Sequence, residues 1–347
     1  MEKVWFDLAN EFAANGHDVW HVSKRYPGLP DHAVVGGVEH VRVGGFSQTH
    51  NGLVRLIRDL TYSTRVAAAI SDADVIVTHS FWSPVILRNT RAVLYVHVAR
   101  FPKQQHRLYR SADRLQAVSS PVAEALVQQG VPSTKVVVIP NPVRLPELRS
   151  TSENPVDDIC FAGRIHPEKG VLELLRAVVT AEGILGRPIN VRLAGPTDTA
   201  AGGGGRAYFE DLKRVAVRMR GSVDFRGLIV DREELNRYIS GVRIFAYPSL
   251  AERGETFGLA VLEAMSLGVP ALVSDLRCFL DFVLPGRNGM VWDRASGLHG
   301  LAQALSTALD QEGRIEQMGM AARRTAEGFT VEKVAGMYLA DFESAIA

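Results

Sequence analysis

Short apolar segments alternate along this chain of 347 residues with stretches in which apolar residues recur every three or four positions. In the first half, the short segments are DVWHVS (18–23), DVIVTHS (74–80), AVLYVHV (92–98), LQAVS (115–119) and KVVVIPN (135–141), and a helical stretch covers 51–70. Continuously apolar strands separated by helices are typical of a parallel sheet covered on both faces. The pattern predicts a doubly wound α/β domain over residues 1–145.

The alternation restarts after a break. Residues 141–158 (NPVRLPELRSTSENPVDD) are rich in Pro, Ser and charge, which predicts a linker at 146–156. Strand-like segments then follow at DICFAGR (158–164), NVRLAGP (190–196), SVDFRGL (222–228), RIFAYPS (243–249) and PALVS (270–274), with helical stretches between them. We expect a second doubly wound domain over 157–328, and a cleft where the carboxyl ends of both sheets meet.

One run inside the second domain has no periodicity. Residues 199–207 read TAAGGGGRA, and four consecutive glycines impose no structure, so we expect a flexible surface loop. A phosphate cradle is the less favoured interpretation, because the run lacks both Gly-x-Gly-x-x-Gly spacing and a Lys-Ser/Thr tail.

Composition and charge narrow the class of protein. The chain is 46% hydrophobic and 22% charged, as expected for globular domains, and its two cysteines cannot form a disulfide framework or a zinc cluster, which favours the cytoplasm. A net charge of +1 argues against a nucleic-acid binder. Residues 1–145 carry 16 Lys and Arg against 11 Asp and Glu, so this half is basic by +5. It could make weak peripheral contact with anionic lipid headgroups, although solvated surface charge is the favoured explanation of the excess.

The most informative stretch is YPSLAERGETFGLAVLEAMSLGVPALVS, residues 247–274. A helix predicted to begin just after Gly258 would present its free N–H groups to an anion such as a diphosphate. Glu255 lies in the preceding loop and Glu263 lies within the helix, eight residues later. These two carboxylates can therefore contact different parts of one ligand, and they are not placed as a facing glycosidase acid/base pair.

This stretch resembles the Glu-x7-Glu signature of the retaining glycosyltransferases of family four, and YPS, FGL, LEAM and GVP match as well. A second segment, FAGRIHPEKGVLELLRA (161–177), is similar to the Gly-Arg-x-x-x-x-Lys-Gly loop of that family. The resemblance covers nearly the whole chain and implies the GT-B fold, in which two Rossmann-like domains face a cleft. It also implies that a closing helix, 331–346 within the segment 329–347, crosses back to the first domain.

The resemblance implies roles for individual residues. Glu263 would bind the ribose hydroxyls and Glu255 a hydroxyl of the donor sugar. Arg164 and Lys169 would neutralise the diphosphate as it leaves. The implied catalytic set is His97, Arg164, Lys169 and Glu255. The implied donor-binding set is Gly163, Arg164, Lys169, Leu228, Ile229, Val230, Glu255, Thr256, Phe257, Gly258, Leu259 and Glu263. His79 has a weaker case, because a structural histidine explains it equally well.

The start of the chain departs from the family pattern. The family's first domain begins with a strand and a Gly-rich turn, whereas residues 1–19 match the pattern just after those glycines. We therefore expect the first domain to lack its first strand, which belongs beside DVWHVS. We also expect Met1 to be an internal methionine of a chain about 15 to 25 residues longer. A family member that has lost this strand is the alternative.

The function implied is transfer of a sugar, with retention, from a UDP- or GDP-linked donor to a hydroxyl of a saccharide, lipid-linked or small-molecule acceptor. The donor's own β-phosphate would accept the acceptor proton. No metal and no cofactor are expected, since no Asp-x-Asp lies at a predicted strand end and cations replace the metal. Two alternatives remain: a nucleotide-sugar epimerase of the same fold, and a catalytically impaired protein that binds nucleotide sugar.

Overall fold

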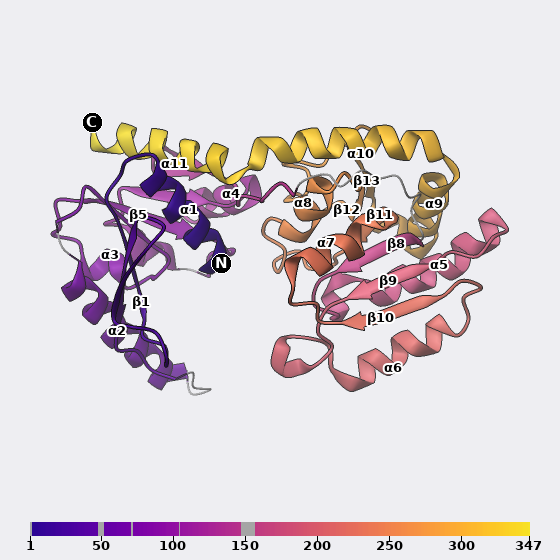
Figure 1. Cartoon of the computed structure of the whole chain (residues 1–347), viewed down its shortest axis with the longest axis horizontal. Helices are drawn as coiled ribbons and strands as arrows, with labels where there is room; N and C mark the ends of the chain where they lie inside the picture. Colours follow the sequence, from indigo (N-terminus) through magenta and orange to yellow (C-terminus); the bar gives the residue numbers. More distant parts are fainter. Residues whose placement is uncertain (1, 48–51, 71, 104, 147–156) are drawn as a thin grey trace. The chain divides into compact units, whose positions relative to one another are not determined.

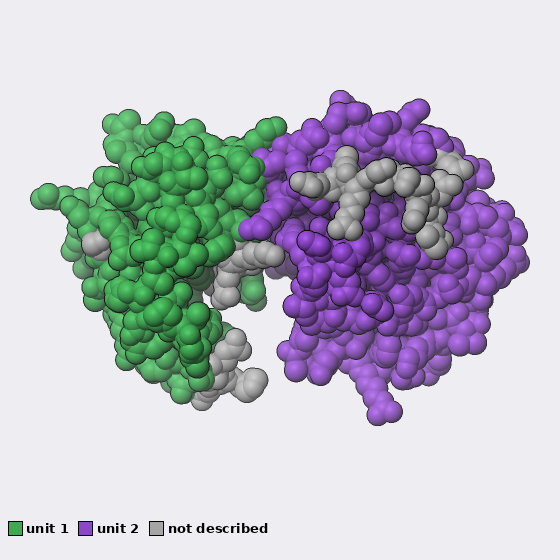
Figure 2. Space-filling model, in the orientation of Figure 1, with its two compact units in different colours: residues 1–142, 331–347 green, residues 143–330 purple. Residues whose placement is uncertain are grey.

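The computed structural model describes residues 2–47, 52–70, 72–103, 105–146 and 157–347 (Figure 1). The chain divides into two compact units (Figure 2). The first consists of Met1–Pro142 and Val331–Ala347, and the second of Val143–Thr330. Met1 and all but the first residue of the predicted linker at 146–156 lie outside the described residues.

The second unit contains one six-stranded sheet in the order β10-β9-β8-β11-β12-β13, and every pairing in it is parallel. Its strands are β8 (Asp157–Ala162), β9 (Val191–Ala194), β10 (Val223–Gly227), β11 (Val242–Tyr247), β12 (Ala271–Ser274) and β13 (Gly289–Trp292). Its helices are α5 (Val171–Leu185), α6 (Gly205–Ala216), α7 (Arg232–Ser240), α8 (Leu259–Ser266), α9 (Gly297–Asp310) and α10 (Glu312–Ala326). Its described residues also form the short 3-10 helices η3 (Pro167–Lys169), η4 (Thr199–Ala201), η5 (Arg294–Ser296) and η6 (Glu327–Phe329). The predicted doubly wound pattern is confirmed here.

The strand order fixes where a ligand can bind to this unit. From β8 the chain moves outward through β9 to β10, and it then returns to the other side of β8 through β11, β12 and β13. The order therefore reverses between β8 and β11, whose registers pair Ile159 with Ile244 and Cys160 with Phe245. In open α/β sheets, ligands bind outside the carboxyl ends of the strands at such a reversal.

The first unit contains two sheets instead of the single sheet that the sequence pattern predicted. One has the order β1-β3-β2 and the other β4-β5-β6-β7. The strands are β1 (Val19–Lys24), β2 (His32–Val35), β3 (Val38–Val43), β4 (Val75–Thr78), β5 (Val93–Val98), β6 (Arg114–Ala117) and β7 (Val136–Val138). The helices are α1 (Glu2–Ala14), α2 (Gly52–Ala69), α3 (Ser83–Ile86), α4 (Ser120–Gln128) and α11 (Val331–Ile346), with 3-10 helices η1 (Gln105–Tyr109) and η2 (Ser133–Lys135). Throughout the described residues, every helix is too short or too polar to cross a bilayer.

Among the described residues, no strand of one sheet pairs with a strand of the other. Within the described residues, β1 pairs only with β3 and β4 pairs only with β5, so each has one side without a ladder partner. The antiparallel hairpin of β2 and β3 was not predicted, although its Gly36–Gly37 turn between valine-rich segments is a recognised hairpin signal.

The core of the first unit contains residues from near both ends of the chain. Leu8 and Phe12 from α1 pack with Tyr95 from β5 and with Tyr338 and Phe342 from α11. The rings of Tyr95 and Phe342 meet edge to face, with their centroids 4.9 Å apart. Because aromatic side chains bury a large apolar area, α11 is an integral layer of this unit and not an appended tail.

Replacing Phe342 with Ala should therefore destabilise the first unit by about 3 to 5 kcal/mol, since the removed ring leaves a cavity among Phe12, Tyr95 and Tyr338. Urea unfolding followed by tyrosine and tryptophan fluorescence measures this loss. Met337→Ala, at an exposed position on the same helix, is the matched control and should change the free energy of unfolding by no more than about 0.5 kcal/mol. Equal effects of the two substitutions would contradict this packing.

Candidate functional site

A buried ion pair lies at the strand reversal of the second unit. Lys169 ends the loop that follows β8, and Glu255 lies in the loop that follows β11. Their Nζ and Oε2 atoms are 2.7 Å apart, and the two side chains are only 6% and 10% exposed. The structure thus brings together two predicted site residues that are 86 positions apart in sequence.

Gly170 explains why these loops approach so closely. Its φ of +68° is unfavourable for other residues, and a Cβ there would lie 2.1 Å from the carbonyl oxygen of Pro248 in the loop after β11. The backbone N–H of Leu250 also donates to the carbonyl of Glu168, at 2.8 Å. Lys169 therefore supplies the charge, and Gly170 supplies the backbone conformation that lets the Lys169 side chain reach Glu255.

Tyr247, the last residue of β11, holds Glu255 from a second side. Its hydroxyl lies close to the Glu255 carboxylate, and its ring stacks on Phe161, with the centroids 5.2 Å apart. Burial, followed by the nearby charge of Glu255, raises the pKa of Tyr247 well above its ordinary value, so the hydroxyl keeps its proton and remains a donor. Sequence reasoning included this tyrosine in a matching string but did not identify it as a site residue.

Arg164 follows β8 and is held by two acceptors. Its Nη2 lies 2.5 Å from Glu168 Oε1, and its Nη1 donates to the carbonyl of Gly202 at 3.0 Å. The side chain of Arg164 is 44% exposed, so the guanidinium remains open to a ligand. A guanidinium has five N–H donors, so these two contacts leave capacity for further acceptors.

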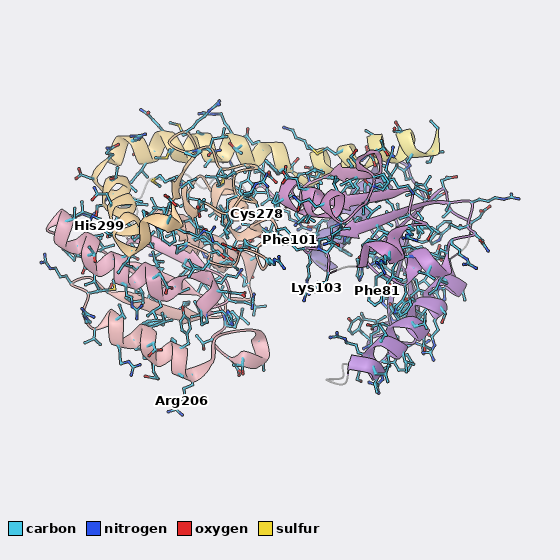
Figure 3. The ribbon with its side chains drawn as sticks, turned by 180° about the vertical axis from the view of Figure 1, so that it is seen from behind. Phe81, Phe101, Lys103, Arg206, Cys278 and His299 are labelled. Carbon is cyan, nitrogen blue, oxygen red and sulfur yellow. The ribbon has the colours of Figure 1, made fainter. Side chains whose placement is uncertain are left out.

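The glycine run at 202–205 differs from the flexible loop that the sequence predicted. A Cβ on Gly202 would lie 2.9 Å from Arg164 Cδ, and one on Gly203 would lie 2.3 Å from the Thr197 backbone. The N–H of Gly204 donates to the carbonyl of Ile165 at 2.8 Å. The run is therefore packed against the loop that carries Arg164, because only residues without a side chain fit there. Arg206, which follows the run, points away from the unit (Figure 3).

The start of α8 supplies backbone donors beside the ion pair. Gly258 is its N-cap with φ +90°, and a Cβ there would lie 2.4 Å from the ring of Phe279. Phe257 is buried against Phe282 and Phe329, which leaves its backbone, and not its side chain, as the part that could contact a ligand. Thr256 and Leu259 flank the same turn. The N–H groups of a first helical turn have no partner within their helix and favour an anion.

Glu263 lies one turn further along α8 and pairs with a residue that sequence reasoning missed. Arg232, the first residue of α7, donates through Nη2 to Glu263 Oε1 at 3.0 Å. Both side chains are partly exposed. The loop before α7 contains Leu228, Ile229 and Val230, of which the first and last are exposed. The structure therefore links this predicted loop to Glu263 through Arg232.

His97 belongs to the first unit, near the end of β5, and is buried. The amide of Gln116 fixes its tautomer. Because Gln116 Nε2 donates to the carbonyl of Ile139, its Oε1 must be the atom that faces His97 Nδ1, and Nδ1 must carry the proton. Among the described residues, Nε2 of His97 has no hydrogen-bond partner and is left as an acceptor. Burial is the main cause that lowers the pKa of His97 to about 4, with a smaller contribution from His79.

The charged residues of the second unit form a site suited to an anionic, hydroxyl-rich ligand. Arg164, Lys169 and Arg232 supply positive charge, and Glu255 and Glu263 supply acceptors for hydroxyl groups. Within the described part of the chain, His, Cys, Asp and Glu side chains form no group of three that could hold a metal ion.

Known proteins resemble both halves of this chain. A family model described as Glycosyltransferase Family 4 matches residues 1–146, and one described as Glycosyl transferases group 1 matches 156–311. The D-inositol 3-phosphate glycosyltransferase of Streptomyces avermitilis is 31% identical over 234 residues, which are 63% of this chain and 49% of that protein. The phosphatidyl-myo-inositol mannosyltransferase of Propionibacterium freudenreichii is 30% identical over 223 residues, covering 59% and 50%. The chain spans about half the length of the curated relatives it matches.

Solved structures resemble nearly the whole chain. A sucrose-phosphate synthase from Thermosynechococcus elongatus matches with a TM-score of 0.78 at 20% identity, covering 99% of this chain and 93% of that one. Anabaena HepE in complex with UDP and glucose matches with a TM-score of 0.72 at 18% identity, covering 99% and 95%. These likenesses confirm the expected GT-B fold.

The buried ion pair predicts a specific pattern of stabilities. Lys169→Met or Glu255→Leu alone should lower the free energy of unfolding of the second unit by about 3 to 5 kcal/mol, because each leaves a buried charge without its partner. The double variant should recover much of this loss, since it buries no charge. Chemical denaturation of the four proteins forms a double-mutant cycle. Strictly additive losses would contradict the coupling.

His97 predicts a pH dependence. In the unfolded chain its pKa is close to 6.5, whereas in the folded unit it is about 4, so the unfolded state binds more protons between these values. Stability should therefore fall as the pH drops from about 6.5 to about 4, by up to about 3 kcal/mol. Urea titrations across this range measure the loss. In His97→Asn, which does not titrate, the part of the slope due to His97 should vanish; an unchanged slope would contradict the assignment.

Proposed function

Because this chain belongs to glycosyltransferase family 4, we propose that it transfers a sugar from a nucleotide diphosphate sugar to an acceptor hydroxyl. The observation that carries the proposal is the convergence of Arg164, Lys169 and the start of α8 at the strand reversal of the second unit. Positive charge and backbone donors at that point stabilise the charge that develops on a departing diphosphate.

The residues of the site are proposed to contact different parts of the donor. Lys169 has three N–H donors, so it can keep Glu255 and still donate to a phosphate oxygen. Arg164 can add a forked pair of hydrogen bonds to the same diphosphate. Glu255, oriented by Lys169 and Tyr247, accepts from a hydroxyl of the sugar, and Glu263, oriented by Arg232, accepts from the ribose. Leu228–Val230 border the base.

We further propose that transfer proceeds with retention and needs no metal. Arg164 and Lys169 take the place of a divalent cation, and the acceptor proton passes to the leaving phosphate on the same face of the sugar. His97 would accept a hydrogen bond from a sugar hydroxyl at Nε2, because its Nδ1 proton is already donated to Gln116. The donor base is uridine or guanosine. Uridine is favoured because HepE, which shares the fold, is described in complex with UDP and UDP-glucose.

The acceptor is proposed to be a hydroxyl of a saccharide or polyol, which can be linked to lipid. The relatives named for D-inositol 3-phosphate and for phosphatidyl-myo-inositol support an inositol-type acceptor as the first candidate.

Calorimetry with UDP and GDP tests the donor site directly. Arg164→Met and Glu263→Gln should each weaken nucleotide diphosphate or nucleotide-sugar binding about tenfold or more, because each loses a charge-assisted hydrogen bond. Arg214→Met and Glu233→Gln, at exposed positions of the same unit, are the matched controls and should bind as the parent does. Equal binding by all five proteins would contradict the site.

Product analysis then separates transfer from its alternatives. The parent protein should form a glycosylated acceptor in the presence of a chelator, with the anomeric configuration of the donor, as read by nuclear magnetic resonance. Conversion of the donor without any acceptor would indicate an epimerase, and binding without turnover would indicate an impaired protein.

A further inference from the structure

Arg294 links three loops at the carboxyl edge of the second unit's sheet. It lies just after β13, in η5, and its Nε donates to the carboxylate of Asp275 in the segment that follows β12. Its Nη1 donates to Glu252 Oε1, at 3.0 Å, in the loop that follows β11. Because β11, β12 and β13 are neighbours in the sheet, one guanidinium joins the ends of three adjacent strands.

The sheet fixes the position of this guanidinium. The N–H of Asp275 donates to the carbonyl of Trp292 at 2.9 Å, so the backbones that carry Asp275 and Arg294 are held together. The side chain of Arg294 is only 26% exposed. A guanidinium is planar and rigid, and with Nε committed to Asp275 its Nη1 points in a fixed direction toward Glu252.

The middle of the loop that carries Glu255, residues 248–255, depends on this contact. The start of the loop is bonded to the loop that follows β8, and its end is the buried ion pair of Glu255. Residues 252–254 lie between these anchors and are exposed. In the part of the chain that the structure describes, the ion pair made from these three positions is that of Glu252 with Arg294.

We propose that Arg294 is a positioning residue for recognition of the donor sugar, because by holding Glu252 it fixes the turn that presents the Glu255 carboxylate. The N–H groups of Gly254 and Glu255 both donate to the carbonyl of Ala251, at 3.1 and 2.9 Å. These bonds close a turn around Glu252, so a displacement there moves the backbone of Glu255. The inference rests on the proposed function, in which Glu255 accepts from a hydroxyl of the sugar.

Exposure limits the size of the expected effect. The side chain of Glu252 is 73% exposed, and solvent screens an ion pair of this kind, so it contributes little to the stability of the whole unit. It can still select one conformation of a surface turn that lies between two anchors. Loss of the pair should therefore loosen the turn and weaken sugar binding a few-fold, while the unit stays folded.

Hydrogen exchange without any ligand tests the positioning itself, independently of the proposed function. In Glu252→Gln, the amides of Gly254 and Glu255 should exchange about two- to fivefold faster than in the parent, because the turn has lost its tether. Glu233→Gln is the matched control: it removes an exposed glutamate from an ion pair with Arg237 on α7 and should leave these amides unchanged. Unchanged exchange in Glu252→Gln would overturn the proposal.

Calorimetry then tests the consequence for the donor, with UDP and UDP-glucose, or with GDP and GDP-mannose if the parent binds GDP instead. Glu252→Gln and Arg294→Lys should each weaken binding of the nucleotide sugar relative to the nucleotide about two- to fivefold, since lysine cannot fork between two carboxylates. Glu233→Gln should bind both as the parent does.

The two variants separate positioning from simple electrostatics. Glu252→Gln removes a negative charge near the diphosphate site, so a purely electrostatic role predicts tighter binding of the nucleotide, and Arg294→Lys, which keeps the charge, would then have no effect. That pattern, or an unchanged ratio of the two dissociation constants, would overturn the inference and leave the proposed function standing. A parent that binds neither UDP nor GDP would overturn the proposed function, and the inference with it.

Discussion

The ion pair between Lys169 and Glu255 is the contact on which the organisation of the second unit's site depends. It joins the loops that follow β8 and β11, the two strands between which the order of the sheet reverses. Burying two charges costs several kcal/mol per ion unless the geometry and the surrounding hydrogen bonds compensate. Tyr247 and the close backbone contact at Gly170 supply that compensation. Removing either charge therefore disturbs the packing of both loops and not the ion pair alone.

Much of this unit could be predicted from sequence, because its signals are local. Continuous apolar segments indicated the strands β8 to β12, and Gly258 before an apolar helix indicated the start of α8. Lys169 and Glu255 were predicted as site residues through a family resemblance, and their direct contact could not be read from spacing. Tyr247, Glu168 and Arg232 were missed because nothing local marks the group that each contacts: Tyr247 ends an apolar strand, and Glu168 and Arg232 are partly exposed charges of an ordinary kind. The packed glycine run was misjudged for the same reason, since its neighbours come from another loop.

The first unit was harder to predict. Period-two alternation in VEHVRV is weak, so the hairpin of β2 and β3 gave little signal beyond its Gly-Gly turn. The partition into two sheets depends on which strand edges find partners, and no local pattern encodes that. The tautomer of His97 likewise depends on Gln116 and on the carbonyl of Ile139, which the pairings of β6 with β5 and with β7 bring together. Pairwise tertiary contacts of this kind are invisible to composition and periodicity.

Each cation of the candidate donor site already has a carboxylate partner: Arg164 with Glu168, Lys169 with Glu255, and Arg232 with Glu263. Three cations without counter-charges would repel one another and would destabilise the loops that hold them. The carboxylates thus keep the site ordered without a ligand, but they also compete with a diphosphate for the same donors. That competition is uneven. The Lys169 pair is buried and should persist, whereas Arg164 is 44% exposed, and solvent weakens its bond to Glu168. Arg164 is consequently the cation that can turn to an incoming phosphate at least cost, while Lys169 keeps Glu255 in place for the sugar.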